Sequence, residues 1–282
     1  MGIAQLMSQG LRVVPMTYCR PHHQMHRSMS TEELIQALGA GRKAGQSLHA
    51  AEWSDAVLGE AQAYAVQDGV AVLLGWMPDG GTVRHWKSGG ASRSGPFSHS
   101  PLDPAGIGSV NPTWPLLGIE AEIALRLGRD VSPADARAMR PEDADAWIDA
   151  MAVSVELVAS RWHEGLAAPA LLRMADCQSH GALMLGPWQA YRRLDWANLT
   201  WRLSQQDAAL IERRGGHSLE DPAWVLPAWL SHLSRGGLTV PAGTVVTTGA
   251  WGGMQALGRS GGLVEVSFEG LGSCRFALPV GH

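Results

Sequence analysis

The chain has 282 residues, 45% of them hydrophobic, which is enough for one large domain with its own core. Acidic residues outnumber basic ones by 26 to 22, so a nucleic-acid-binding surface is not expected. No apolar run approaches the roughly 18–20 residues of a membrane span, and the three cysteines are few, odd in number and far apart, as in a cytoplasmic protein.

Residues 1–29 are expected to form a loosely ordered N-terminal extension, because they lack the continuous apolar core of a signal peptide. A metal site at His22, His23 and His26 is the alternative for this segment. Met29 is a second natural start, and the sequence STEE that follows it is a capping box that predicts a helix over residues 30–44. Residues 30–282 are expected to form a single catalytic domain, helical over 30–80 and sheet-rich over 81–282.

Further elements follow from hydrophobic periodicity and turn residues. A second helix is expected over residues 54–74, with Ser54 or Asp55 as its N-cap. The later elements, in chain order, are a turn at 77–81, a strand at 82–90, a loop at 88–114, a strand at 116–130, a helix at 132–151, strands at 151–162 and 181–188, a helix at 223–237, a strand at 243–251 and a hairpin at 263–278. This order indicates an α+β fold.

The stretch LLGIEAEIALRLGRD, residues 116–130, alternates apolar and polar residues. Such alternation indicates a half-buried strand, on which Glu120 and Glu122 lie side by side, roughly 7 Å apart. Glu156 is the only charged residue between positions 151 and 160. A divalent cation would compensate all three carboxylates, and an all-oxygen ligand set favours Mg²⁺ or Mn²⁺ over zinc. For the pair alone, a solvated strand face is the alternative.

Five segments, in this order, resemble motifs of the fumarylacetoacetate hydrolase superfamily: GIEAEIALRLGRD, VELVASRW, MADCQSHGALMLG, VVTTGAWGG and FEGLGS. The likeness covers roughly residues 30–278 and is closer to the branch of 2-keto-4-pentenoate hydratases and 2-oxo-3-hexenedioate decarboxylases. It implies a mixed β-sandwich or roll with flanking helices, and a homo-oligomer. Cys177, Thr244 and Ala159 depart from the Asn, Asp and Asp common in the family, but none of them is at a metal-ligand position.

The resemblance also implies the site residues. They are the Mg²⁺ or Mn²⁺ ligands Glu120, Glu122 and Glu156, the catalytic candidates Lys87, Asp176 and Ser179, and the substrate-binding candidates Lys87, Ser179 and Thr248. The structural alternatives are an exposed lysine, a turn or cap at residues 176–179, and a strand end at Thr248. His85 and His99 are expected at the surface, and Arg161 is expected either to pair with a glutamate or to lie at the surface.

The metal would chelate the carboxylate and 2-oxo oxygen of a small 2-oxo acid, so that an enolate can form. The first hypothesis is a lyase that hydrates a 2-hydroxypenta-2,4-dienoate-like substrate. A 2-oxo acid decarboxylase or an acylpyruvate-type C–C hydrolase is the alternative, because all three reactions need the same chelate. The hypothesis from another class is a non-catalytic binding protein on the same fold. No nucleic-acid or membrane partner is expected.

Overall fold

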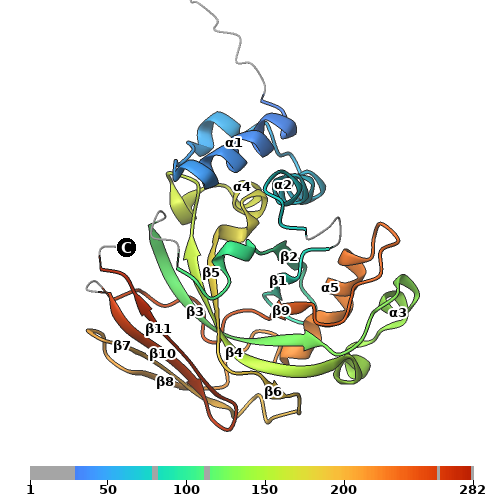
Figure 1. Ribbon diagram of the computed structural model, residues 1–282, viewed down its shortest axis with the longest axis vertical. Coiled ribbons are helices and arrows are strands. Elements are labelled where there is room, and N and C mark those ends of the chain that lie inside the picture. The colour runs from blue at the N-terminus through green and yellow to red at the C-terminus, as the bar shows by residue number, and fades with distance from the viewer. Residues whose placement is uncertain (1–28, 78–81, 111–114, 259–260, 281–282) are drawn as a thin grey trace, which may run out of the picture.

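The computed structural model describes residues 29–77, 82–110, 115–258 and 261–280 (Figure 1). The expected extension at 1–29 and the turn at 77–81 lie almost wholly outside the described residues. The helices are α1 (Thr31–Ala44), α2 (Glu60–Leu73), α3 (Pro133–Ala138), α4 (Ala170–Ala175) and α5 (Leu226–Leu233). The strands are β1 (His85–Gly90), β2 (Phe97–Pro101), β3 (Leu116–Leu127), β4 (Ile148–Ala159), β5 (His180–Leu185), β6 (Gln189–Ala190), β7 (Thr200–Gln205), β8 (Ile211–Arg214), β9 (Val245–Thr247), β10 (Gly262–Phe268) and β11 (Gly272–Leu278).

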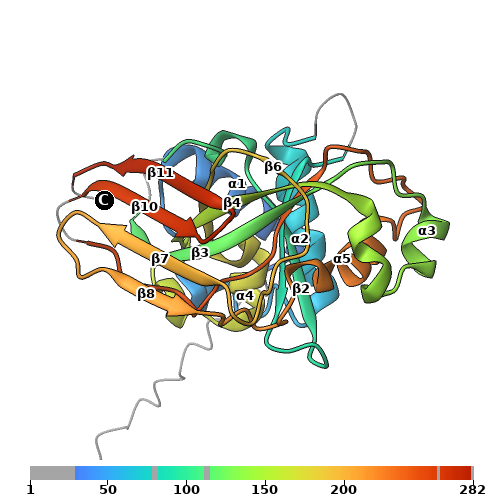
Figure 2. The ribbon, with the colours of Figure 1, turned by 90° about the horizontal axis from the view of Figure 1, so that it is seen from below.

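The strands form two sheets. The larger has the order β2-β1-β9-β3-β4-β5, with β6 also paired to β4, and the smaller has the order β11-β10-β7-β8. The larger sheet is mixed, because β1 and β9 run parallel while their neighbours are antiparallel. Helices α1, α2 and α4 gather at one end of the molecule (Figure 1), and the small sheet lies at one side of it (Figure 2). The predicted α+β fold with a mixed sheet is confirmed.

Strands β3 and β4 lie near the centre of the large sheet, and eleven of the twelve residues of each are paired with the other strand. Ile119, Ala121 and Ile123 point to one face and join the hydrophobic core. The opposite face is also enclosed, since Glu122 is 2% exposed and Glu156 is fully buried. The strand is therefore more enclosed than its alternation predicts. The alternative of a solvated polar face does not hold for Glu122, while Glu120 and Arg126 on the same face stay partly exposed.

The expected capping residues are found at the start of α1 but not at the start of α2. The capping box of α1 is present: the Ser30 hydroxyl accepts from the Glu33 amide at 3.2 Å and the Glu33 carboxylate accepts from the Ser30 amide at 2.9 Å. Helix α2 begins at Glu60 after Gly59, so Ser54 and Asp55 are not its caps. The preceding residues form a short 3₁₀ helix, Ala50–Trp53, whose apolar residues pack into the core instead of continuing a helix.

Three other expectations are corrected. The helix expected at 132–151 is divided into α3 and a 3₁₀ helix, Pro141–Trp147, because the residue before a proline avoids the helical region and Arg140 is extended. Strand β4 then begins at Ile148 rather than at 151. Strand β2 lies within the segment expected to be loop, and β7, β8 and α4 form where no element was expected.

In the part of the chain that the structure describes, eight tryptophans are buried in the core, among them Trp162, Trp201, Trp229 and Trp251. None of the helices in the described part of the chain is both long enough and apolar enough to span a membrane.

Candidate active site

One face of the large sheet brings Lys87 and the three predicted glutamate ligands together from β1, β3 and β4, with β9 lying between β1 and β3. Glu120 on β3 pairs directly with Glu156 on β4, and Glu122 follows two positions along the same face. Lys87 on β1 pairs with Thr247 on β9, which in turn pairs with Ala124 on β3. Because alternate residues of a strand share a face, these register pairs place the lysine and the three carboxylates on one side of the sheet.

The three carboxylates have the chemistry and spacing of a divalent-cation site. One ligand oxygen from each of Glu120, Glu122 and Glu156 lies within 4.8 Å of the others. Glu156 Oε2 is buried and accepts no hydrogen bond. A buried carboxylate oxygen without a partner is costly, and a cation at this position would satisfy it. The residues therefore fit a hard cation such as Mg²⁺, which takes oxygen ligands.

The pKa values of the three carboxylates differ. Burial raises the pKa of Glu120 to about 7 and that of Glu122 to about 8, and the charge of Glu156 adds to both shifts. Burial also acts on Glu156, but the Lys87 charge and a hydrogen bond from His180 outweigh it, so the pKa of Glu156 is lowered. Glu156 thus stays ionised, whereas at neutral pH Glu120 is partly protonated and Glu122 largely so, and an added positive charge would favour the ionised form of both.

Lys87 lies beside the carboxylates as a charged donor, as predicted for a site residue. Its Nζ is 2.7 Å from Glu156 Oε1 and donates to the backbone oxygen of Gln178 at 3.2 Å. Burial lowers the pKa of Lys87, but the charges of Glu156 and Glu120 outweigh it and the net shift is upward. The exposed-lysine alternative does not apply, because the side chain is 13% exposed and faces the site.

Glu122 is held by the strand next to its own. The Thr247 hydroxyl donates to Glu122 Oε2, the Gly249 amide donates to the same oxygen at 3.2 Å, and Ser154 hydrogen-bonds to Thr247 at 2.8 Å. The Thr248 hydroxyl is turned away and donates to the Ile123 carbonyl at 2.8 Å. A substrate contact by Thr248 would require that bond to break, whereas Thr247, which was not among the predicted site residues, orients a candidate ligand.

Asp176 stabilises a strained backbone segment next to the site, Cys177–Ser179, which we call the corner. Its carboxylate pairs with Arg161 at 2.5 Å and with Arg42 at 3.1 Å, and it accepts from the Arg161 amide at 3.0 Å. The three residues after it, Cys177, Gln178 and Ser179, all have left-handed backbone angles, with φ of 49°, 54° and 59°. Such conformations cost free energy for non-glycine residues and persist only where surrounding contacts hold them. Asp176 therefore holds the corner that places Gln178 O on Lys87.

The site opens into two adjoining cavities of about 420 and 440 Å³, which share Lys87, Ser98, Glu120 and Gln178. Ser179 lines the first cavity, and its buried hydroxyl has no hydrogen-bond partner. Glu122 and the glycines Gly89 and Gly90 line the second. A small organic acid fits a space of this size beside the carboxylates.

Besides Thr247, the structure adds His180 to the site, and two residues for which a surface position was considered are buried. His180, which is buried, places Nδ1 at 3.1 Å from Glu156 Oε1 and so orients that carboxylate. His99 was expected at the surface but is 4% exposed and hydrogen-bonds to Ser88 at 2.8 Å. Arg161 is likewise buried and pairs with an aspartate rather than a glutamate. Sequence spacing alone signals none of these contacts, because each partner is distant along the chain.

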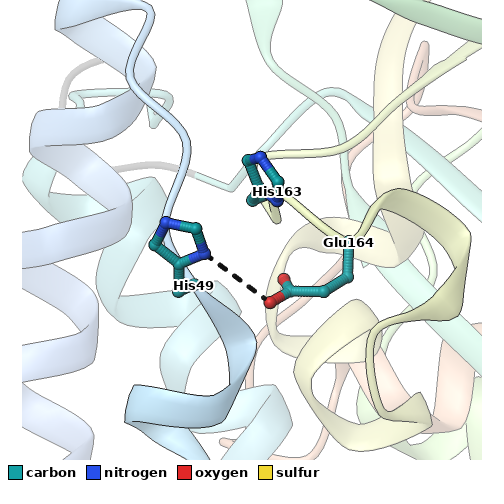
Figure 3. Close-up of side chains that lie close together, drawn as sticks. All are labelled: His49, His163 and Glu164. Carbon is teal, nitrogen blue, oxygen red and sulfur yellow. Dashed lines mark ion pairs between the residues drawn. The ribbon is translucent and has the colours of Figure 1, made fainter.

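A second group of metal-ligating side chains lies at the surface. The rings of His49 and His163 lie with their centroids 4.7 Å apart and are tilted by 40°, and His49 Nδ1 is 3.8 Å from a Glu164 oxygen (Figure 3). The other Glu164 oxygen accepts from the Ala50 amide at 3.0 Å, at the start of a 3₁₀ helix. All three side chains are exposed. Glu164 thus caps the 3₁₀ helix and pairs with His49, and these contacts join two surface segments.

The raised pKa values of Glu120 and Glu122 predict how stability depends on pH without metal. The folded chain holds these protons up to pH about 7 to 8, whereas unfolded glutamates lose them near 4.5. Between those values the folded state binds more protons, so the free energy of unfolding falls as pH rises. The buried histidines His99 and His217 and the half-buried His232 act in the opposite direction, but only below about pH 7, because their pKa values are lowered from 6.5. We therefore expect the Tm in chelator to fall between about pH 7 and pH 8, and Mg²⁺ to restore it at the higher pH. A Glu120→Gln, Glu122→Gln double variant should flatten this profile, and an unchanged slope would contradict the assignment.

Asp176→Asn should destabilise the protein by about 3 kcal/mol, because the substitution removes a buried carboxylate that pairs with both Arg161 and Arg42. Urea unfolding monitored by tryptophan fluorescence measures this loss. Asp195→Asn is a matched control, since Asp195 is exposed and its carboxylate bonds only to nearby Asn198 at 2.9 Å. Equal unfolding free energies for the two variants would show that Asp176 does not hold the corner.

Comparison with known proteins places the segment that carries most of these residues in a known family. Residues 105–278 match the family model described as fumarylacetoacetate (FAA) hydrolase C-terminal. The match includes the three glutamates, Asp176 and Ser179, while Lys87 precedes it.

Two similar solved structures, both of one enzyme, share the fold. One is 4-oxalocrotonate decarboxylase from Pseudomonas putida G7 complexed with magnesium and adipate, with a TM-score of 0.72 and 18% identity over 87% of this chain and 95% of that chain. The same enzyme complexed with calcium and acetate has a TM-score of 0.71, with 18% identity over the same shares, 87% and 95%. A 5-carboxymethyl-2-hydroxymuconate delta-isomerase from Mycobacterium smegmatis has a TM-score of 0.49 and 17% identity over 68% and 76% of the two chains.

Proposed function

The chain belongs to the fumarylacetoacetate hydrolase C-terminal family, and we propose that it is a divalent-metal-dependent enzyme that acts on a small 2-oxo acid. The observation that carries the proposal is the group of three enclosed carboxylates with one unsatisfied oxygen, beside a lysine and a cavity. The magnesium complex of the similar decarboxylase supports Mg²⁺, and Mn²⁺ has the same ligand preference. We assign the catalytic domain to residues 30–282.

When bound, the metal would hold the substrate carboxylate and 2-oxo oxygen and draw electrons toward the 2-oxo group. Glu120, Glu122 and Glu156 are its proposed ligands. The Lys87 ammonium lines both cavities, so it can hold the negative charge that develops on the substrate oxygen or deliver a proton from Nζ. The unpartnered Ser179 hydroxyl can hydrogen-bond to the substrate. Asp176 acts through the corner that it holds and does not need to touch the substrate.

Hydration of an unsaturated 2-oxo acid is the first proposed reaction, because the hydratase and decarboxylase branch resembles the chain along most of its length. Decarboxylation is the second candidate, since Arg173 lines the cavity and could hold a second carboxylate. C–C hydrolysis of an acylpyruvate needs the same metal chelate. A non-catalytic binding protein would keep the metal group but turn over none of these substrates.

Turnover of a panel of 2-oxo-4-enoates and their dienols tests the proposal. Ultraviolet loss of the dienol reports hydration, and carbon dioxide release reports decarboxylation. We expect turnover that is lost after exhaustive chelation and restored by Mg²⁺ or Mn²⁺. Activity that survives complete metal removal would overturn the metal-dependent reaction, and no turnover of any member would favour the binding protein.

A cytoplasmic homo-oligomer is the assembly we propose. The buried free thiols of Cys177 and Cys274 are compatible with a reducing compartment. Exposed apolar side chains, including Leu58 at 75% and Val72 at 65%, are candidates for a subunit interface. Multi-angle light scattering at micromolar concentration should give a multiple of the 30.1 kDa chain mass, and the mass of one chain would contradict the proposal.

A further inference from the structure

The surface group of His49, His163 and Glu164 differs from the three glutamates of the sheet in its ligand chemistry. One ligand atom from each of its side chains lies within 4.8 Å of the others, and all three side chains are exposed. Two imidazole nitrogens and one carboxylate oxygen form a ligand set that suits Zn²⁺, whereas an all-oxygen set suits Mg²⁺. The two groups are therefore expected to select different cations.

The backbone places the two histidines side by side. Leu48 and Trp162 form a parallel β-bridge, and each is followed by one of the histidines. The Leu48 amide donates to the Arg161 carbonyl and the Leu48 carbonyl accepts from the His163 amide, both at 2.8 Å. Because the two segments run in the same direction, His49 and His163 advance together from the bridge, and their ring centroids lie 4.7 Å apart.

The chain around the histidines is fixed by burial and by a turn. Ala50 and Trp162, which are adjacent to them, are 3% and 2% exposed. The Gly165 amide donates to the Trp162 carbonyl at 2.9 Å, which closes a turn with His163 and Glu164 at its two central positions. Figure 3 shows the three side chains of the group gathered between the two segments. The ligands are thus brought together by the fold, while their exposed side chains can still rotate.

Glu164 is oriented through one oxygen and leaves the other for a cation. One oxygen accepts from the Ala50 amide at 3.0 Å, and the other lies 3.8 Å from His49 Nδ1. The hydrogen bond from Ala50 is the main cause that lowers the pKa of Glu164, so the carboxylate is ionised at neutral pH. Tetrahedral Zn²⁺ with bonds of about 2.0–2.2 Å holds its ligand atoms roughly 3.4 Å apart. Small rotations of the exposed side chains would therefore complete the site.

We propose that His49, His163 and Glu164 bind Zn²⁺, with water as the fourth ligand. The ion would join the segment after α1 to the segment after β4. Because the ligands come from distant parts of the sequence, the unfolded chain does not hold them together, and zinc should stabilise the folded state by mass action. The segment after β4 also carries Arg161, whose side chain pairs with Asp176. Zinc would thus fasten the N-terminal helices to the chain that supports the corner.

Equilibrium dialysis of the full chain against Zn²⁺ in excess Mg²⁺ tests the site. Wild-type protein should bind zinc, and Glu122→Gln should keep this zinc because it weakens only the carboxylate group in the sheet. His163→Gln and Glu164→Gln should each lower the zinc affinity by more than about tenfold, since changes to groups that merely orient metal ligands already cost about 10- to 100-fold. Glu164→Gln keeps an oxygen acceptor for the Ala50 amide, so its effect reports the lost charge.

Thermal unfolding of the same proteins gives a second readout. Zinc should raise the Tm of the Glu122→Gln protein, and adding His163→Gln to that protein should abolish the rise. Both His163 and Glu164 are exposed, so their variants should match the parent Tm in chelator, which shows that they are folded. A zinc-dependent rise that persists after His163→Gln would overturn the site.

The N-terminal histidines provide the matched control. His22, His23 and His26 are a competing imidazole group at positions outside the described residues. The triple variant His22→Ala, His23→Ala, His26→Ala should keep both the zinc affinity and the Tm rise. Zinc binding that is lost in the triple variant but kept in His163→Gln would overturn the site, as would zinc binding lost only in Glu122→Gln. Wild-type protein that binds no zinc in excess Mg²⁺ would also overturn it.

Discussion

Glu122→Gln is expected to abolish Mg²⁺-dependent binding of oxalate and to reduce turnover to background. The substitution keeps the size of the side chain but replaces a charged oxygen ligand with a neutral amide. The carboxylate it removes is 2% exposed and lies with Glu120 and Glu156 in one group of oxygens. Titration calorimetry with oxalate, a small chelating analogue of a 2-oxo acid, measures the loss.

The effect of Glu122→Gln on folding can be measured separately from its effect on binding. Burial raises the pKa of Glu122 to about 8, so the metal-free protein carries it largely protonated at neutral pH, and a neutral glutamine should be tolerated. The Tm of the metal-free variant should therefore equal or exceed that of the wild type at about pH 8. Glu269→Gln, at an exposed position between β10 and β11, is the matched control and should bind oxalate normally. Unchanged oxalate affinity in Glu122→Gln would exclude Glu122 as a ligand.

The metal group could be predicted from the sequence because its signal is local. Alternation over residues 116–130 places Glu120 and Glu122 on one face of a strand, and Glu156 is conspicuous as a lone charge in an apolar run. What alternation cannot give is the environment of that face. The alternation indicates a half-buried strand, with a solvated face as the alternative for the glutamate pair, but in the structure Glu122 is buried and Glu120 is only partly exposed.

The contacts that support the site could not be predicted, because they join residues from distant segments. Thr247 reaches Glu122 across a strand pair that brings β9 between β1 and β3. Arg42 of α1 pairs with Asp176, which follows α4. Arg173 lies on a helix of six residues, too short for helical periodicity to stand out. These pairings depend on strand order and helix docking, for which one sequence carries no direct signal.

Lys87→Met is expected to lower kcat/KM by about 10²–10³-fold, the cost of losing one preorganised donor to developing charge. Methionine keeps the aliphatic length of the side chain and removes only the ammonium. That ammonium lies 2.7 Å from Glu156 Oε1, and the raised pKa of Lys87 keeps it charged through the neutral range. Its removal should therefore act on the chemical step, with kcat falling more than KM rises.

Metal content in Lys87→Met should be retained or increased. Lys87 is a positive charge in contact with a proposed ligand, so its loss removes a competitor for Glu156 and a repulsion toward the cation. Lys43, the only other lysine of the sequence, lies exposed at the end of α1, and Lys43→Met is the matched control that should keep full activity. Near-normal turnover in Lys87→Met would remove Lys87 from the catalytic step. Loss of metal together with activity would instead mean that the Lys87–Glu156 pair is needed to hold the ligand in place.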